Sequence, residues 1–240
     1  MSFVQFIRER TLLHNVSPAT VSWYTHALKK LPCASPDPQQ LKDLVLSMRE
    51  SGLRPGGCNA AARAINAYLS WLGSPHRAPL MKDPVVAQRT FTADQVRLLV
   101  HSDYDPRLRS LVALMLDTGC RISEALSLRS EDIGDGTLTL HGKGGKDRVV
   151  PFSVRPQPPY PWTRHMALRL VKRQCRALGF EPPPRTLHAF RHTFALHYVR
   201  TGGGVFHLQR VLGHSSLEMS RRYANLAAAD LVAAHRSPLL

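Results

Sequence analysis

The chain has 240 residues, of which 43% are hydrophobic, and a formal net charge of +15 at pH 7. This length accommodates two domains of ordinary size, each with its own hydrophobic core. No apolar run approaches the roughly 20 residues that span a bilayer, and the amphipathic N-terminus lacks a secretory leader, so we expect neither a membrane protein nor a secreted one.

The excess positive charge is mostly arginine and is spread over both halves of the chain. Arginine binds phosphate through two parallel hydrogen bonds, so this excess favours nucleic acid as the partner over acidic proteins or membranes. The cysteines are far apart and form no Cys-x-x-Cys pair, which argues against disulfides and a cysteine zinc site. We therefore expect a DNA-binding protein in a reducing cytoplasm, associated with the nucleoid or, if phage-encoded, in the host cytoplasm.

Residues 1–75 predict a small bundle of three or four helices. Ser17-Pro18 and Asp37-Pro38 each place an N-cap residue before a proline at the first helical position. A third helix is predicted from about residue 59 to 72. Residues 76–90 carry proline and charge without an apolar period, and this composition predicts a linker.

Residues 91–240 predict a second domain of helices around one β-hairpin, so the expected fold class is mainly α with a small β-sheet. Thr92 and Gln95 form a capping box at the start of the first helix. A tight turn at Gly119 separates two helical segments between residues 108 and 128. The remaining elements are strands over 137–140 and 148–152 around a glycine-rich tip, and helices over roughly 162–178 and 225–236.

Residues 186–223 hold side chains suited to phosphate chemistry. His188 and Arg191 are three positions apart, so they project from one face of a helix. A fixed planar cation beside a titratable donor suits an anionic phosphate. His214 and Tyr223 follow a short apolar helix, and together these residues are a candidate for nucleophilic phosphoryl transfer.

Three further signals are weak when taken singly. Arg121 follows the Gly119 turn at a helix start, where free N–H groups suit phosphate, although a surface arginine that caps a turn fits as well. Lys143 could protonate a leaving oxygen from the hairpin tip, or be a solvated basic turn. Tyr223 needs cations and a base nearby to act as a nucleophile, and an interface tyrosine is the alternative.

Three histidines on one predicted helix, His188, His192 and His197, raise the possibility of a metal site. No acidic residue neighbours them, and Arg191 on the same face repels a cation. We therefore prefer phosphate over zinc and predict no metal. His192 and His197 are interpreted as packing or surface residues.

At these positions the sequence resembles the tyrosine recombinase family, which comprises phage integrases and Xer-type recombinases. The resemblance covers roughly residues 91–235 and rests on Thr118-Gly119-Cys120-Arg121-Ile122-Ser123-Glu124-Ala125-Leu126, His141-Gly142-Lys143-Gly144-Gly145-Lys146-Asp147-Arg148, His188-Ala189-Phe190-Arg191-His192, and Leu212-Gly213-His214-Ser215-Ser216 with Tyr223.

The resemblance implies that Arg121 and Arg191 clamp the scissile phosphate and stabilise its transition state. Tyr223 would be the nucleophile, leaving a 3′-phosphotyrosyl link and a free 5′-hydroxyl. No metal or nucleotide is implied, because the phosphotyrosyl bond keeps the energy of the broken phosphodiester.

Four more roles follow from the same resemblance. Lys143 would be the general acid for the leaving oxygen, and His188 a general acid/base near the tyrosine. His214 would hydrogen-bond the phosphate, and Glu124 would support the site without reacting. DNA contacts are expected at Arg54, Arg63, Lys146, Arg148, Arg221 and Arg222.

The implied function is site-specific DNA recombination by a homotetramer on two synapsed duplexes, through a Holliday junction. Residues 1–75 would be a core-type DNA-binding domain, and residues 91–240 an α+β catalytic domain. The helix at about 225–236 would dock on a neighbouring subunit or fold back in cis. The free protein is expected to be a monomer or a weak oligomer.

Two departures and two rival functions remain. The segment 153–185 is about one helix shorter than the family leads us to expect, and no additional arm-type DNA-binding domain is evident. A topoisomerase IB-like enzyme would use the same chemistry, although the two-domain layout favours a recombinase. A non-catalytic DNA-binding protein of this fold would be expected to lack one of the four motifs quoted above, but all of them are present in this sequence.

Overall fold

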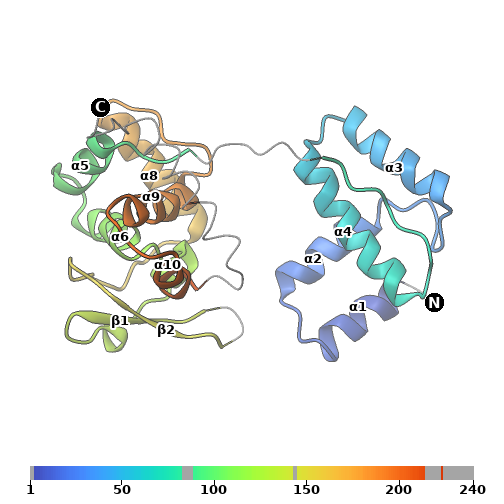
Figure 1. The fold of residues 1–240 in the computed structure, drawn as a ribbon, viewed down its shortest axis with the longest axis horizontal. Helices are drawn as coiled ribbons and strands as arrows, with labels where there is room; N and C mark the ends of the chain where they lie inside the picture. The colour runs from blue at the N-terminus through green and yellow to red at the C-terminus, as the bar shows by residue number, and fades with distance from the viewer. Residues whose placement is uncertain (1–2, 83–88, 143–144, 214–222, 224–240) are drawn as a thin grey trace, which may run out of the picture. The chain divides into compact units, whose positions relative to one another are not determined.

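The computed structural model describes residues 3–82, 89–142, 145–213 and 223. The chain divides into two compact units, Met1–Val86 and Ala87–Leu240, and each has its own hydrophobic core (Figure 1). The predicted fold class, mainly helical with one small antiparallel sheet, is confirmed. Within the described part of the chain, no helix combines the length and the apolar character that crossing a bilayer requires.

The first unit contains the helices α1 (Phe3–Leu12), α2 (Pro18–Leu28), α3 (Pro38–Glu50) and α4 (Pro55–Trp71). The predicted N-caps are confirmed, because the side chains of Ser17 and Asp37 accept hydrogen bonds from the third backbone N–H of their helices. Helix α4 begins at Pro55, earlier than predicted, because a proline preceded by extended backbone favours the first helical position.

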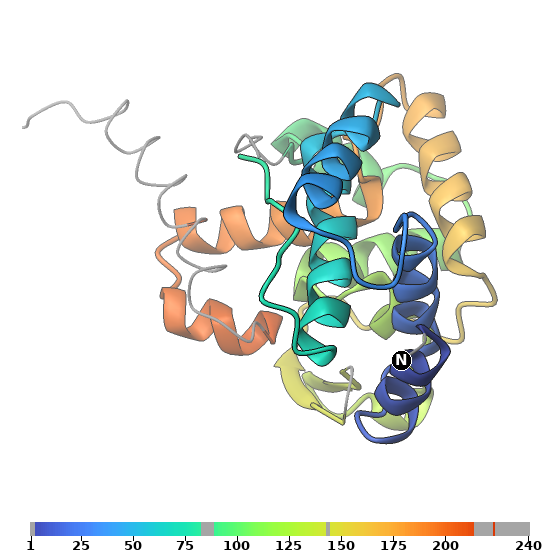
Figure 2. The same cartoon turned by 90° about the vertical axis from the view of Figure 1, so that its right-hand side faces the viewer.

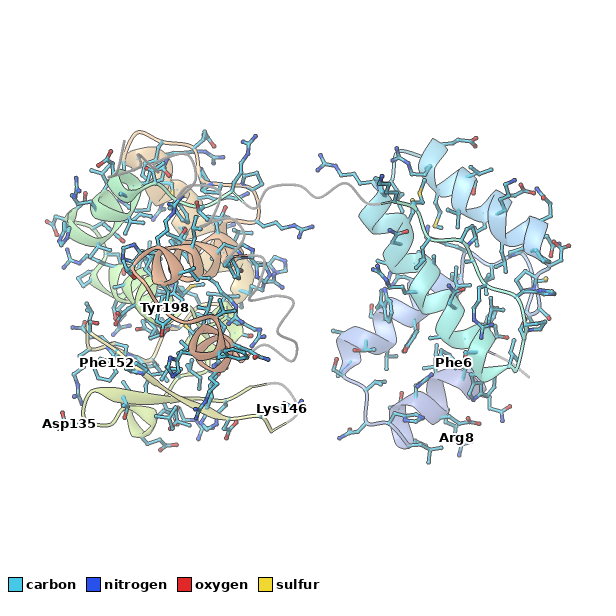
Figure 3. All side chains as sticks on the ribbon, viewed as in Figure 1. Phe6, Arg8, Asp135, Lys146, Phe152 and Tyr198 are labelled. Atoms are coloured by element: carbon cyan, nitrogen blue, oxygen red, sulfur yellow. The ribbon has the colours of Figure 1, made fainter. Side chains whose placement is uncertain are left out.

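An aromatic cluster fills the core of this bundle. Phe6, labelled in Figure 3, is fully buried. Its ring meets those of Tyr24, Tyr68 and Trp71 edge-to-face, with centroid distances of 5.0, 5.4 and 5.6 Å. Edge-to-face rings add about 0.5–1.5 kcal/mol per pair to the burial of their area. The bundle is therefore stabilised chiefly by apolar contacts between α1, α2 and α4.

Part of the predicted linker lies against this bundle. The Asn59 amide bonds both the N–H and the C=O of Met81, and Asn66 does the same for Ala78. Ala78 is buried in the core of the first unit. The linker prediction therefore begins too early, because these two amides satisfy a stretch of backbone that shows no apolar period.

The second unit packs its helices over one hairpin. Its elements are α5 (Ala93–His101), α6 (Pro106–Thr118), α7 (Ile122–Leu126), the 3-10 helix η1 (Ser130–Asp132), β1 (Thr137–Leu140), β2 (Arg148–Pro151), α8 (Arg164–Ala177), α9 (Thr186–Arg200) and α10 (Val205–Leu212). The strands are antiparallel, with Thr137 opposite Pro151 and Leu140 opposite Arg148. Helix α9 packs against α6 and α10, and α10 lies beside β2 (Figures 1 and 2).

Gly119 allows α6, α9 and α10 to meet closely. It caps α6 with a φ of 63°, which favours glycine. A Cβ atom there would lie 2.3 Å from Phe194 Cδ1 and 2.7 Å from Leu212 Cδ2. The predicted turn is thus confirmed, and it places Arg121 at the start of α7.

Candidate active site

A buried carboxylate, Glu124 on α7, holds two arginines. It accepts hydrogen bonds from the backbone N–H and the Nη1 of Arg121, both at 2.8 Å. Arg148, at the start of β2, binds the two carboxylate oxygens through Nη1 and Nη2 at 2.9 and 2.8 Å. Glu124 therefore sets the position of Arg121.

The charge of Glu124 is favoured despite its burial. Burial acts to raise the pKa of the carboxyl group, but the hydrogen bonds from Arg148 and Arg121 outweigh it and lower the pKa to about 2. The side chain is 4% exposed, and that of Arg148 is 11% exposed. The guanidinium of Arg121, by contrast, is 41% exposed and can reach a ligand.

Arg191 on α9 joins the C-terminal ends of two helices. Its Nη1 donates to the carbonyl of Gly119 at 3.0 Å, and its Nη2 donates to the carbonyl of Leu212 at 2.7 Å. Helix C-termini favour cations, because their carbonyl groups carry partial negative charge. Burial and the neighbouring charge of Arg121 lower the pKa of Arg191 to about 10, so it remains charged at neutral pH.

Two site arginines therefore fix the end of α10. Arg191 binds the Leu212 carbonyl, and Arg148 binds the carbonyl of the preceding residue, Val211, through Nε at 2.7 Å. All three guanidinium nitrogens of Arg148 thus donate inside the protein. This geometry does not support the predicted DNA contact at Arg148, because its side chain is committed to Glu124 and α10.

His188 lies among arginines on the exposed side of α9. It lines a pocket of about 260 Å³ together with Arg164, Leu168, Arg185 and Leu187. Loss of hydration lowers the pKa of the imidazole, and the positive charges of Arg164, Arg191, Arg185 and Arg121 lower it further. The ring is therefore neutral at pH 7 and next to a strongly positive surface that would attract an anion.

Tyr223 is buried, and its hydroxyl group contacts a histidine that the sequence analysis assigned to packing. The side chain is 4% exposed and lies against Ala195, Leu208 and Leu212. The distance between Tyr223 Oη and His192 Nδ1 is 2.5 Å. The sequence shows that His192 follows His188 by one helical turn. It does not show that His192 contacts Tyr223, which lies 31 positions further along the chain.

His192 is neutral at physiological pH. Burial lowers the pKa of its imidazole to about 4, and His188, Arg191 and Arg185 add to the effect. The pKa of Arg191 is in turn affected by Arg121 and Tyr223. The structure therefore brings four of the residues singled out in the sequence, Arg121, His188, Arg191 and Tyr223, within electrostatic reach of one another.

The β-hairpin that should carry Lys143 is braced at its root. His141, directly after β1, contacts Asp132 through Nε2 and Asp147 through Nδ1, each at 2.9 Å. Hydrogen bonds to these two carboxylates raise the pKa of His141. The brace links η1 to both ends of the tip, and Lys146 is exposed there (Figure 3).

Several predicted residues lie outside the described residues. They are Lys143, His214, Arg221, Arg222 and the helix expected at about 225–236. The predicted DNA-contact residues Arg54 and Arg63 are exposed on the first unit. Among the described residues, the site thus combines a phenol, two neutral imidazoles and three arginines around one buried carboxylate, an arrangement suited to an anionic phosphoryl group.

Comparisons with known proteins identify the family. The model of the phage integrase family matches residues 89–164 and 155–230. Tyrosine recombinase XerA of Pyrococcus furiosus is 28% identical over 91% of this chain and 87% of its own length. The putative integrase of Pseudomonas phage Pf1 is 32% identical over 78% of this chain and 62% of its own length.

Solved structures show the same fold. The XerH site-specific recombinase, bound to a palindromic difH substrate in a post-cleavage complex, matches with a TM-score of 0.73 at 19% identity, over 97% of this chain and 84% of that one. A lambda integrase tetramer bound to a Holliday junction matches with a TM-score of 0.66 at 17% identity, over 89% and 76% of the two chains. This chain belongs to the phage integrase family, the tyrosine recombinases whose sequence boxes it carries.

Proposed function

We propose that this chain is a site-specific DNA recombinase that cleaves and rejoins DNA through a 3′-phosphotyrosyl link at Tyr223. One observation carries the proposal furthest: the hydroxyl of the buried Tyr223 contacts His192 on α9, within electrostatic reach of Arg191. A phenol with a pKa near 10 becomes a nucleophile only where a base and cations are close, and both are present.

The arginines would act on the scissile phosphate. Arg191 is held rigidly by two carbonyl groups, and Arg121 by Glu124, so both are placed before the substrate binds. The negative charge that develops on the phosphate oxygens in the transition state would be stabilised by these two guanidinium groups, which are already in position. His188, neutral and exposed between the arginines, would exchange a proton or a hydrogen bond with the same phosphate.

The remaining roles rest on the resemblance. Lys143 would protonate the 5′-oxygen as it leaves, and His214 would bind the phosphate. The first unit would be the core-type DNA-binding domain, with Arg54 and Arg63 facing the duplex backbone and Lys146 adding a contact from the hairpin. The active assembly would be a homotetramer on two duplexes, acting on DNA in the cytoplasm.

A topoisomerase IB-like enzyme is the second candidate, because its chemistry is the same. The relatives reported above are recombinases and integrases, and this favours strand exchange over the resealing of one strand. An assay with two labelled duplexes distinguishes the two, because only a recombinase joins strands from different molecules.

The test is covalent trapping on nicked DNA that carries a candidate core site. The nick lets the 5′-end diffuse away, so the wild type should form an adduct stable to SDS. Tyr223→Phe removes one oxygen atom and should bind the DNA without forming an adduct. Tight binding by the wild type without an adduct, across several candidate sites, would instead favour a non-catalytic DNA-binding protein.

A further inference from the structure

His192 faces the oxygen atom that would attack the DNA. Its Nδ1 lies 2.5 Å from Tyr223 Oη, and the two ring centroids are 5.8 Å apart. The imidazole is half-buried in the middle of α9, so the helix backbone fixes its direction.

The protonation state of His192 decides the direction of this hydrogen bond. Burial and the neighbouring His188, Arg191 and Arg185 keep the ring neutral at pH 7. A neutral imidazole has one N–H donor and one acceptor nitrogen, and the phenol is the natural donor in this pair. With the phenol as the donor, Nδ1 is the acceptor and the imidazole proton is on Nε2.

We infer that His192 is a further catalytic residue, which accepts the phenolic proton of Tyr223 as the tyrosine attacks the scissile phosphorus. The inference rests on the proposed function. The Tyr223 Oη–H bond breaks and a bond to phosphorus forms, while the proton moves to Nδ1. The bond between phosphorus and the 5′-oxygen breaks, and that oxygen takes a proton from the predicted general acid, Lys143. Rejoining reverses both transfers, so His192 returns its proton to the departing tyrosine.

The low basicity of His192 in the protein alone is compatible with this role. The cations that disfavour its protonated form include Arg191, the residue expected to bind the phosphate. A bound phosphate offsets that positive charge and so favours the imidazolium ion. His192 would thus remain an acceptor until DNA binds and become a stronger base in the complex.

This arrangement assigns different tasks to the two histidines of α9. His188 is exposed beside Arg164 and Arg185, where an incoming phosphate would lie. His192 contacts the buried tyrosine instead. The acid/base role near the tyrosine, which the resemblance implies for His188, therefore belongs to His192 by geometry.

The first test is the rate of adduct formation on nicked DNA in a single turnover. Asn at position 192 can accept a hydrogen bond near the position of Nδ1 but cannot take a proton, whereas Phe keeps the ring shape without an acceptor. We expect both His192→Asn and His192→Phe to slow cleavage by about 10²-fold or more, with DNA affinity unchanged. His197→Asn, an exposed position on the same helix, is the matched control.

The outcomes separate this inference from the proposed function. Wild-type speed in His192→Asn would mean that His192 only positions the tyrosine, and would overturn the inference alone. A wild-type protein that forms no adduct would overturn both.

The second test needs no DNA. In ¹⁵N NMR spectra of imidazole-labelled protein at pH 7, His192 should be the neutral tautomer with the proton on Nε2. Its Nδ1 resonance should move in Tyr223→Phe, which lacks the donor. A cationic His192, or a proton on Nδ1, would overturn the inference whatever the cleavage assay shows.

Discussion

The two units bury different kinds of polar group. In the first, the buried amide of Asn59 satisfies neutral backbone groups, and residues 3–82 contain no ion pair. In the second, Glu124 and Arg191 are buried charges, and the ion pairs among the described residues all lie between positions 94 and 181. Apart from Arg10, whose guanidinium lies over the Phe6 ring, the described cations of the first unit are exposed to solvent, whereas the second unit encloses Arg191 in its core.

The proposed function assigns DNA binding mainly to the first unit and the chemistry to the second, and this difference in burial fits that division. Exposed arginines on a stable bundle can attract a polyanion without being held in one geometry. Enclosed arginines cost desolvation energy but keep a fixed position, which stabilisation of a transition state requires. Mutations in the first unit should therefore change DNA affinity, and mutations in the second should change cleavage or stability.

The largest effect on stability is expected for Glu124→Gln. The buried guanidinium of Arg148 would lose its partner, and removal of one member of a buried pair typically costs about 3–5 kcal/mol. Glu181→Gln, which breaks the exposed pair with Arg176, is the control and should change the free energy of unfolding much less, because solvent screens this pair. Urea unfolding measures the free energy of unfolding of both variants. Equal losses would contradict the expected difference between the buried pair and the exposed pair.

The same carboxylate should make the second unit sensitive to acid. The pKa of Glu124 is about 2 in the folded chain and 4.5 without its partners. Its stabilising contribution is therefore complete above about pH 4.5 and is lost as the pH falls toward 2. Unfolding free energies between pH 6 and pH 3 should fall less steeply in Glu124→Gln than in the wild type.

Arg191→Lys should remove cleavage and keep binding. An ammonium group lacks the planar fork that reaches both the Gly119 and Leu212 carbonyls. We expect adduct formation to slow by about 10²–10³-fold. DNA affinity should change little, as it should in the control Arg97→Lys, an exposed position paired with Asp94. A large loss of affinity in Arg191→Lys alone would place this arginine in binding instead.

Gly119→Ala should destabilise the second unit more than Gly179→Ala does. Both glycines have positive φ, but an added Cβ meets Phe194 and Leu212 at position 119 and nothing within 4 Å at position 179. Backbone strain alone costs about 1–2 kcal/mol, and overpacking adds about 1–3 kcal/mol at position 119 only. Thermal unfolding of the two variants measures the difference, and equal losses would contradict the steric role assigned to position 119.

The smallest effect is expected in the first unit. Arg54→Ala and Arg63→Ala should weaken DNA binding, and each lost phosphate contact should reduce the slope of log K against log[salt] by about 0.9. Cleavage at saturating protein should be unchanged, because neither residue belongs to the catalytic unit. If cleavage were lost and a higher protein concentration did not restore it, the proposed assignment of DNA binding to the first unit and cleavage to the second would be wrong.

Local signals in the sequence predicted local structure well. The caps at Ser17, Asp37 and Thr92 are confirmed, because an N-cap bonds a backbone group only three residues away. The Gly119 turn was likewise predicted from its own neighbourhood. The family resemblance supplied the identities of the site residues, including Arg121 and Arg191.

Contacts between distant segments could not be predicted in this way. Nothing near Arg148 indicates that its partners are Glu124 and the end of α10, and a basic residue on a hairpin was naturally interpreted as a DNA contact. His192 was assigned to packing for the same reason, because spacing along one helix does not reveal what lies opposite. Packing of separate elements decided both cases.

The fixed end of α10 has a consequence for the reach of the nucleophile. Arg148 and Arg191 hold the carbonyls of Val211 and Leu212, and Tyr223 follows Leu212 by 223 − 212 = 11 residues. A chain of that length spans at most about 36–40 Å when fully extended. If Arg191 binds the scissile phosphate as proposed, the covalent distance from its contact at Leu212 sets an upper limit on how far from that phosphate the Tyr223 hydroxyl can lie.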